Sequence, residues 1–161
     1  FGDVNPSGKL PITYPKTPNG ITLYDYKPIE KFDGNDYNPL WPFGYGLSFT
    51  TFEYSNLKIS SQEIIENEEI SVKIDVKNTG NVAGKEVVQL YLTDLYGSIT
   101  RPNKQLKGFE KVLLNPGETK TIKFKINKEH LSFIGQENKR ITEPGDFEVI
   151  IANNTATFSL K

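Results

Sequence analysis

From Phe52 to the end of the chain, apolar and polar residues alternate in short segments. The clearest segment is 69–78, where branched apolar residues occupy every second position: Ile70, Val72, Ile74 and Val76. A period of two puts these side chains on one face and the polar ones on the other, which indicates a half-buried strand. The same alternation predicts strands over residues 52–59 (with a slip near Ser55 and Asn56), 86–93, 105–114 (bent at Gly108), 119–126, 140–142, 147–151 and 155–160.

Turn signals separate the predicted strands. Asn115-Pro116-Gly117-Glu118 has proline and glycine at the two central positions of a type II turn, and Glu143-Pro144-Gly145-Asp146 repeats that dipeptide. Residues 128–134 favour one short helical turn that carries Leu131, Phe133 and Ile134 inward, and no long helix is indicated. Seven to eight short strands, about 8–12 residues apart, predict an all-β chain. The expected fold is an antiparallel β-sandwich of the immunoglobulin or fibronectin type III kind over residues 47–161.

Residues 1–46 lack this periodicity. Glycine and proline are dense there, and Asn5-Pro6-Ser7-Gly8 is a turn signal by itself. A run this long without regular structure is uncommon inside a compact domain. It also contains several aromatic residues, whereas a disordered linker has few. We therefore predict an irregular N-terminal arm that lies across a neighbouring surface.

Aromatic residues are concentrated where the arm meets the first predicted strand. Residues 39–54 hold six of the nineteen aromatic residues: Trp41, Phe43, Tyr45, Phe49, Phe52 and Tyr54. Proline and glycine exclude a regular helix or a central strand there, so we expect the rings to pack in an irregular junction. Phe49, Phe52 and Tyr54 should be buried where the sandwich begins. Upstream, we expect Tyr24, Phe32 and Tyr37 to be left uncovered or to be covered by an improvised contact.

Composition narrows the range of partners. The formal net charge is −1, with 19 basic and 20 acidic residues, so charge gives no reason to expect nucleic acid or an anionic membrane. No apolar run approaches the roughly 20 residues of a membrane helix. Cysteine is absent, which excludes disulfides and thiolate chemistry and leaves the cellular compartment open. The chain begins at Phe1 without methionine, from which we expect a larger parent protein.

No arrangement of residues indicates catalysis, a cofactor or a metal. His130 is the only histidine, and no serine lies in a G-x-S-x-G motif. Asp33 and Asp36 resemble a calcium loop only loosely, because the terminal glutamate is missing. One acidic cluster precedes the clearest strand, but nothing apolar surrounds it, so it indicates a solvated loop rather than a catalytic pair: Glu63, Glu66, Glu68 and Glu69.

Candidate binding residues are therefore aromatic: Tyr24, Tyr26, Tyr37, Trp41 and Phe43. Their rings can pack against a neighbouring domain or stack on sugar rings, and the pattern favours packing. Arg101 can bind a carboxylate or a sugar, or it can anchor its own loop through an ion pair.

Three stretches of the chain resemble the C-terminal end of family 3 glycoside hydrolases, the β-glucosidase group. FGDVNPSGKLPITYP is similar to the segment that closes the family's α/β sandwich domain. PLWPFGYGLSFTTFEYSNL is similar to the crossing into the last domain. VKNTGNVAGKEVVQLYL, TRPNKQLKGFEKVLLNPGETKTIKF and EPGDFEVIIANN resemble the family's fibronectin type III-like domain.

This resemblance implies a parent enzyme that hydrolyses β-glucosides with retention of configuration, using a carboxylate pair. In the family, the aspartate nucleophile lies on an upstream barrel and the glutamate acid/base usually lies on the α/β sandwich. No residue of this chain matches either motif, so both catalytic groups would lie outside it. The chain itself would be an inactive accessory region that docks on the catalytic domains of its parent.

Two other functions stay open. The chain can be a carbohydrate-binding module that uses its exposed aromatic residues, or a free-standing interaction module of the immunoglobulin type. An isolated arm with exposed rings is also expected to associate with itself.

Overall fold

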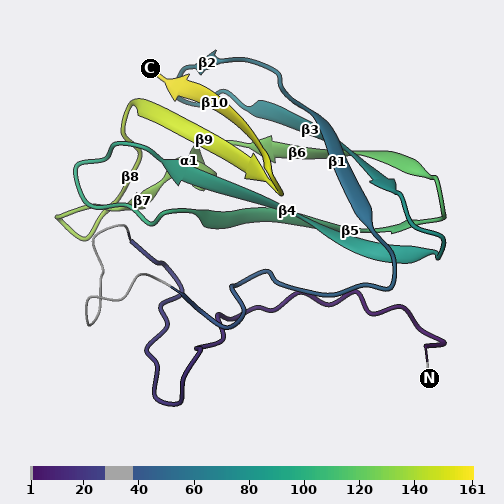
Figure 1. Cartoon of the computed structure of the whole chain (residues 1–161). Coiled ribbons are helices and arrows are strands. Elements are labelled where there is room, and N and C mark those ends of the chain that lie inside the picture. Colours follow the sequence, from purple (N-terminus) through teal and green to yellow (C-terminus); the bar gives the residue numbers. More distant parts are fainter. Residues whose placement is uncertain (1, 28–37) are drawn as a thin grey trace.

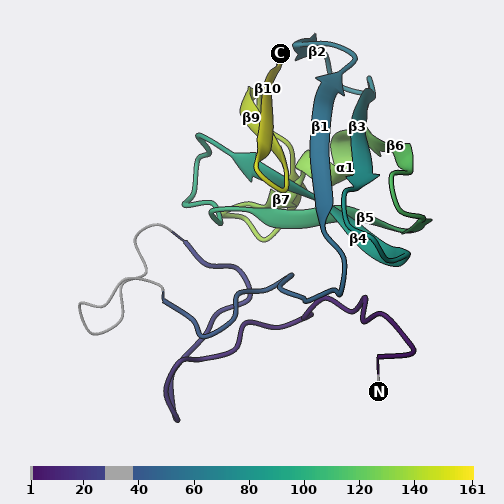
Figure 2. The ribbon, with the colours of Figure 1, turned by 45° about the vertical axis from the view of Figure 1, so that its right-hand side comes forward.

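The computed structural model describes residues 2–27 and 38–161, and strands make up most of the part after Thr51. Two sheets face each other (Figures 1 and 2). The first has three antiparallel strands in the order β1-β3-β6: β1 (Phe52–Ile59), β3 (Ile70–Asn78) and β6 (Thr119–Ile126). The second has five strands in the order β2-β10-β9-β4-β5: β2 (Glu63–Ile64), β10 (Asn154–Leu160), β9 (Gly145–Ile151), β4 (Gly84–Asp94) and β5 (Gln105–Leu114).

Three shorter elements complete the described part of the chain. Helix α1 (Lys128–Leu131) follows β6, and β7 (Phe133–Ile134) pairs with β8 (Arg140–Ile141). Strand β2 runs parallel to β10, whereas the other neighbours in the two large sheets are antiparallel. The all-β sandwich predicted from the alternation is confirmed. Seven long strands match the predicted count, and the two-residue strands β2, β7 and β8 add to it among the described residues.

The core lies between the two sheets and follows the predicted facing of the strands. The four alternating residues of β3 are 0% exposed, namely Ile70, Val72, Ile74 and Val76, while Lys73 is exposed. Opposite them, Phe147 of β9 and Phe158 of β10 stack with ring centroids 5.5 Å apart. Burying such side chains stabilises the fold by about 1.5–3 kcal/mol each.

Local irregularities in the strands also follow the sequence. The β1–β3 register shifts between Ser55 and Lys58, where Asn56 has φ 56°, as the predicted slip requires. Gly117 has φ 76° and Glu118 N–H donates to Asn115 O at 3.0 Å, in agreement with a type II turn.

Two local predictions are wrong. Gly145 begins β9 and is not among the described glycines with positive φ, so Pro144-Gly145 does not repeat the type II turn. Ile134 is 49% exposed rather than buried. It follows Phe133 in β7 instead of continuing the helix, and successive strand residues point to opposite faces.

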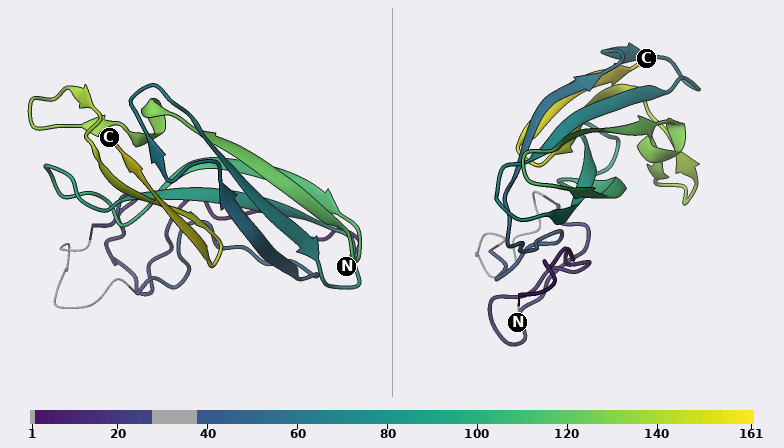
Figure 3. Two further views of the ribbon diagram at one scale, coloured as in Figure 1. Left: turned by 90° about the horizontal axis from the view of Figure 1, so that it is seen from above. Right: turned by 90° about the vertical axis from the view of Figure 1, so that its right-hand side faces the viewer.

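The arm lies along the sandwich beneath β4 and β5 (Figures 1 and 2). Its two passes are hydrogen-bonded to each other: Leu10 N–H donates to Tyr45 O at 2.8 Å, and Tyr14 N–H donates to Trp41 O at 2.8 Å. In return, Gly44 N–H donates to Leu10 O and Leu40 N–H donates to Tyr14 O. Contacts from Lys9 to Glu86 and from Phe43 to Tyr91 place the arm on a face of this chain's own sandwich. Figure 3 shows the arm from two further sides.

Candidate functional site

The aromatic side chains between positions 39 and 45 form two sets: an inner one that contacts the sandwich and an outer one that does not. Tyr45 N–H donates to Pro42 O at 3.1 Å, and Gly44 has φ 81°, as the third residue of a type II turn needs. A side chain at Gly44 would stand 2.5 Å from Tyr91 Oη, so the backbone must approach β4 closely there. This turn brings Trp41 and Tyr45 side by side and leaves Phe43 packed against the sandwich.

Phe43 forms the inner contact. Its ring meets the Tyr91 ring of β4 edge-on at 6.5 Å and the Tyr24 ring at 5.3 Å. Each such pair contributes about 0.5–1.5 kcal/mol beyond the buried area. Tyr91 lies between the core residues Leu90 and Leu92 of β4 and is not part of the core, yet it is only 8% exposed because the arm covers it. Burial raises the pKa of Tyr91 to about 12, and Tyr24 adds to that rise.

Trp41 belongs to the outer set. It stacks on Tyr45 with ring centroids 6.3 Å apart and an interplanar angle of 14°, and it meets Tyr14 edge-on at 5.5 Å. We call Tyr14, Trp41 and Tyr45 the outer aromatic cluster. All three are exposed, at 43%, 41% and 38%, although they contact one another. Within the described residues they form the largest group of contacting exposed rings.

The remaining predicted site residues behave differently from one another. Tyr26 is half-buried, and its carbonyl accepts a hydrogen bond from Asn103 N–H at 2.7 Å, so it anchors the arm to the β4–β5 loop. Tyr24 is 68% exposed despite its contact with Phe43. Tyr37 and Phe32 lie outside the described residues. The Phe43 ring is the one aromatic contact that the described residues give Tyr24.

The predicted burial of Phe49, Phe52 and Tyr54 at the end of the junction is only partly correct. Phe52 and Tyr54 are half-buried and pack against the core. Phe49 is 60% exposed, so its predicted burial is wrong. Its backbone N–H is held by Asn5 Oδ1 at 2.8 Å, which fixes this residue in the arm before β1 begins.

Hydrogen bonds and an ion pair connect the start of the arm to the sandwich. Asn5 Nδ2 donates to Ala83 O at 3.2 Å, and its Oδ1 also accepts from Ser48 Oγ at 2.9 Å. Lys9 Nζ lies 3.0 Å from Glu86 Oε1, which accepts a further hydrogen bond from Tyr54 Oη at 2.8 Å. Burial, followed by the Glu86 charge, raises the pKa of Tyr54 well above its usual range. The sequence marked Asn5 only as part of a turn signal and did not mark Lys9, because the contacts of both residues involve partners distant in the chain.

The ionisable residues that were considered for chemistry are either exposed or engaged in structural contacts. The acidic cluster of residues 63–69 is exposed, as predicted. His130 Nδ1 lies 2.6 Å from Asn127 Oδ1 in the capping box of α1. Arg101 Nε donates to Asp94 at 3.0 Å, which matches the loop-anchoring alternative. Across the described ranges, no group of three His, Cys, Asp or Glu residues could hold a metal ion. No helix there is long and apolar enough to cross a membrane.

Comparison with known proteins finds similarity to one part of several longer proteins. Residues 86–155 match the family of fibronectin type III-like domains. The chain is 43% identical to a periplasmic β-glucosidase of Salmonella typhimurium, over 97% of this chain and 22% of that protein. It is 40% identical to a β-xylosidase of Formosa agariphila, over 100% of this chain and 23% of that protein. A solved β-glucosidase structure from Erythrobacter marinus superposes with a TM-score of 0.89 at 36% identity, over 100% of this chain and 22% of the other.

These relatives are much longer than the chain. It spans less than a quarter of the length of these curated relatives, while they cover nearly all of it. The similarity therefore extends through the arm as well as the sandwich.

Proposed function

Because this chain belongs to the C-terminal, fibronectin type III-like region of family 3 glycoside hydrolases, we propose that it is a non-catalytic accessory domain. Its role is to dock on the catalytic domains of a longer β-glucosidase-like enzyme and to stabilise them. That enzyme would hydrolyse the O-glycosidic bonds of β-glucosides with carboxylates that lie outside this chain. The division into an arm of residues 1–46 and a sandwich of residues 47–161 is part of the same proposal.

The outer aromatic cluster is the observation that carries the docking role. Tyr14, Trp41 and Tyr45 are held in place by hydrogen bonds between the two passes of the arm, yet each is more than a third exposed. Ile12 and Leu40 in the same two passes are 53% and 49% exposed. A rigid group of exposed apolar side chains is typical of an interaction surface, and aromatic residues are enriched among those that dominate binding energy.

The docking surface faces away from the sandwich. The sandwich side of the arm is occupied by Phe43, Lys9 and Asn5, which already contact β4 and its neighbourhood. A partner on the opposite side would cover the outer aromatic cluster without disturbing these contacts. The remaining three quarters of the relatives' length supplies domains that could provide such a partner.

The test uses a longer enzyme of this family cut before the region that this chain matches. The pure chain should not hydrolyse an aryl β-glucoside, and adding it to the cut enzyme should raise the thermal stability and activity of that enzyme. Turnover by the chain alone would contradict the proposal, as would a cut enzyme that is fully stable and active without it.

Sugar binding is the second candidate, and the exposure of Trp41 is the observation that favours it. Stacking by Tyr45 on one face of Trp41 leaves less ring surface for a sugar, so we rank it below docking. Titration with gluco-oligosaccharides separates the two: tryptophan fluorescence that stays unchanged at millimolar sugar contradicts this candidate.

Self-association is expected of the chain when no partner covers the outer aromatic cluster. Sedimentation velocity should show a dimer that Trp41→Ser weakens. A strictly monomeric chain at high concentration would remove this part of the proposal.

A further inference from the structure

Three lysine side chains form a row across the outer face of the three-stranded sheet. Lys58 of β1 lies directly opposite Lys73 of β3, and Lys73 lies directly opposite Lys123 of β6. All three are exposed, and we call them the lysine row. Neighbouring strands are about 4.7–4.9 Å apart, so the lysine row spans about 10 Å. The arm lies beneath β4 and β5 of the other sheet (Figures 1 and 2), so the row is separate from the outer aromatic cluster.

This arrangement of lysines is unfavourable for the isolated sheet. Like charges directly opposite each other on adjacent strands are destabilising, and Lys73 belongs to two such pairs. Lysines on edge strands commonly prevent a sheet from pairing with another chain, which accounts for Lys58 and Lys123 on the edge strands β1 and β6. That role does not extend to Lys73, because β3 is the central strand. A locally unfavourable arrangement of this kind is typical of a functional site.

Two further lysines of the same sheet already have acidic neighbours. Lys125 forms an exposed ion pair with Glu69 at 3.0 Å, and Lys77 lies directly opposite Glu53. These two pairs offset their own charges, so neither carboxylate neutralises the lysine row.

Asp75 is the carboxylate that lies beside the lysine row. Hydrogen bonds from Thr121 and Asn56 lower the pKa of Asp75, and the charge of Lys58 adds to this effect. Within residues 2–27 and 38–161, however, no lysine of the row forms an ion pair with a carboxylate. One negative charge beside three positive ones leaves the lysine row with a net positive charge.

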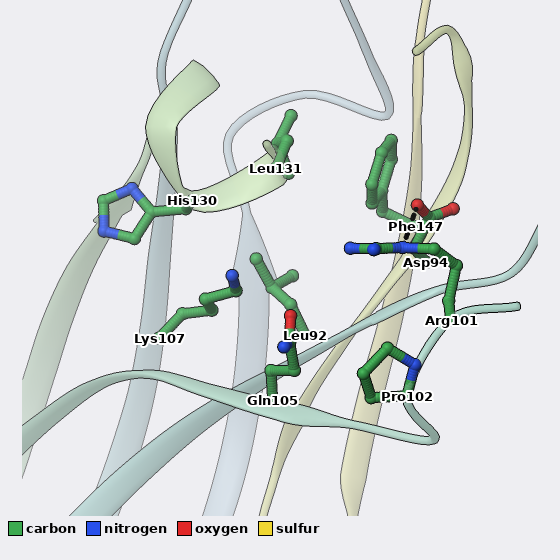
Figure 4. A pocket seen from close by; sticks show the side chains of 9 residues that line it. All are labelled: Leu92, Asp94, Arg101, Pro102, Gln105, Lys107, His130, Leu131 and Phe147. Atoms are coloured by element: carbon green, nitrogen blue, oxygen red, sulfur yellow. Dashed lines mark hydrogen bonds and ion pairs between the residues drawn. The ribbon is translucent and has the colours of Figure 1, made fainter. Parts of the chain in front are cut away.

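The small pocket between β4, β5 and α1 offers no comparable site. Its cavity of about 10 Å³ has room for about one water molecule. Its Arg101 is paired with Asp94 at 3.0 Å, as the dashed line in Figure 4 shows. The lysine row differs in that its positive charges are open to solvent.

The other side chains of this face indicate which kind of partner fits it. Ser71 and Thr121 add hydroxyl groups beside the lysine row. Among the described residues, none of the exposed large hydrophobic side chains lies on β1, β3 or β6. A protein partner would need an apolar centre in the interface, and a membrane surface would need apolar side chains to insert. A hydrated polymer with repeated carboxylates needs neither, and it can reach all three ammonium groups.

We propose that the lysine row binds an acidic polysaccharide, with carboxylates along the polymer paired with the three ammonium groups. Because the carboxylates are linked, each contact after the first forms at a high effective concentration. Binding also relieves the repulsion between the opposed lysines. The choice of a sugar polymer rests on the proposed function, since a β-glucosidase-like enzyme acts on sugars, whereas the lysine row does not depend on docking.

Calorimetric titration of this chain with sodium polygalacturonate in low-salt buffer tests the proposal. The combined variant Lys58→Gln, Lys73→Gln and Lys123→Gln should bind at least about tenfold more weakly than the wild type, because three charge-assisted contacts are lost. Added salt should weaken wild-type binding. The control has the same net charge and should keep wild-type binding, since it changes exposed lysines elsewhere: Lys16→Gln, Lys85→Gln and Lys111→Gln.

The stability of the free chain gives a second measurement. Lys73→Gln alone should raise the urea midpoint at low salt, because it removes both like-charge pairs, and the gain should vanish at high salt. Lys85→Gln should leave the midpoint unchanged. Equal midpoints for Lys73→Gln and the wild type at low salt would contradict the repulsion within the lysine row.

Equal loss of polygalacturonate binding in the two triple variants would overturn the proposal, as would a wild-type chain that does not bind this polymer. Polyglutamate, or vesicles of anionic phospholipid, that bind as tightly as polygalacturonate would overturn the choice of a polysaccharide. The titration uses this chain alone. A chain that binds polygalacturonate without stabilising the cut enzyme would therefore support this inference and contradict the accessory function.

Discussion

Lys9 of the arm and Glu86 of β4 form an ion pair with 3.0 Å between Nζ and Oε1. Glu86 is only 7% exposed, and Tyr54 Oη donates to the same oxygen. A carboxylate buried to this degree is stable only with such partners. The arm is therefore part of the unit that folds, because its Lys9 supplies the positive charge that pairs with the buried Glu86 carboxylate of the sandwich.

Lys9→Met should lower the free energy of unfolding by about 1–3 kcal/mol, because it leaves the Glu86 carboxylate with Tyr54 as its remaining partner. Urea unfolding measures the change. Adding Glu86→Gln should restore part of the loss, since the unpaired charge is then gone. Lys85→Met is the control, because Lys85 is exposed. Equal midpoints for Lys9→Met and Lys85→Met would mean that the ion pair does not stabilise the fold.

Strand β3 alternates between buried and exposed side chains, so it offers a second pair of variants: one at a buried position and one at an exposed position. Ile74→Asp places an unpaired charge in a position that is 0% exposed, and it should cost several kcal/mol of stability. Lys73→Asp changes an exposed position and should cost well under about 1 kcal/mol. Thermal or urea unfolding compares them, and coincident curves would refute the assigned facing.

The turn between β9 and β10 contains an alanine in the left-handed region, since Ala152 has φ 51°. Glycine adopts this conformation without steric cost, so Ala152→Gly should raise the free energy of unfolding by about 0.5–1 kcal/mol. Ala156→Gly in the neighbouring strand β10 should instead lower it, because glycine weakens a strand. A destabilised Ala152→Gly would argue against this backbone conformation.

Asp75 makes stability depend on pH in the acid range. Its carboxylate accepts hydrogen bonds from Thr121 Oγ1 at 2.5 Å and Asn56 Nδ2 at 2.9 Å, and these bonds hold its pKa below 3.8. A depressed carboxyl pKa means that the unfolded chain binds the proton first on acidification. Stability from Asp75 is therefore present above about pH 4 and is lost as the pH falls through the folded-state pKa.

Asp75→Asn should accordingly show a smaller loss of urea midpoint than the wild type between about pH 5 and pH 2.5. Glu110→Gln serves as the control, because Glu110 is an exposed residue of β5. If both variants lose as much stability as the wild type on acidification, the hydrogen bonds to Asp75 do not shift its titration.

Periodicity predicted the sandwich because each strand carries its own pattern, as Ile70 to Val76 illustrate. It did not predict that the arm covers Tyr91, since that contact joins Phe43 to a distant strand. The exposure of Phe49 was missed for the same reason: Asn5 fixes its position. Alternation also did not predict that Lys107 is an inserted residue in β5, and a one-residue change of register reverses the facing that alternation predicts.

Docking through the outer aromatic cluster is tested most directly by calorimetric titration of this chain into a family enzyme that lacks the matching C-terminal region. Trp41→Ser combined with Tyr45→Ser should bind at least about tenfold more weakly than the wild type, because buried aromatic residues dominate interface energies. Tyr96→Ser removes a ring that is 80% exposed in the β4–β5 loop, and it should bind within about twofold of the wild type. Equal affinities for the two variants, with both folded, would contradict the account.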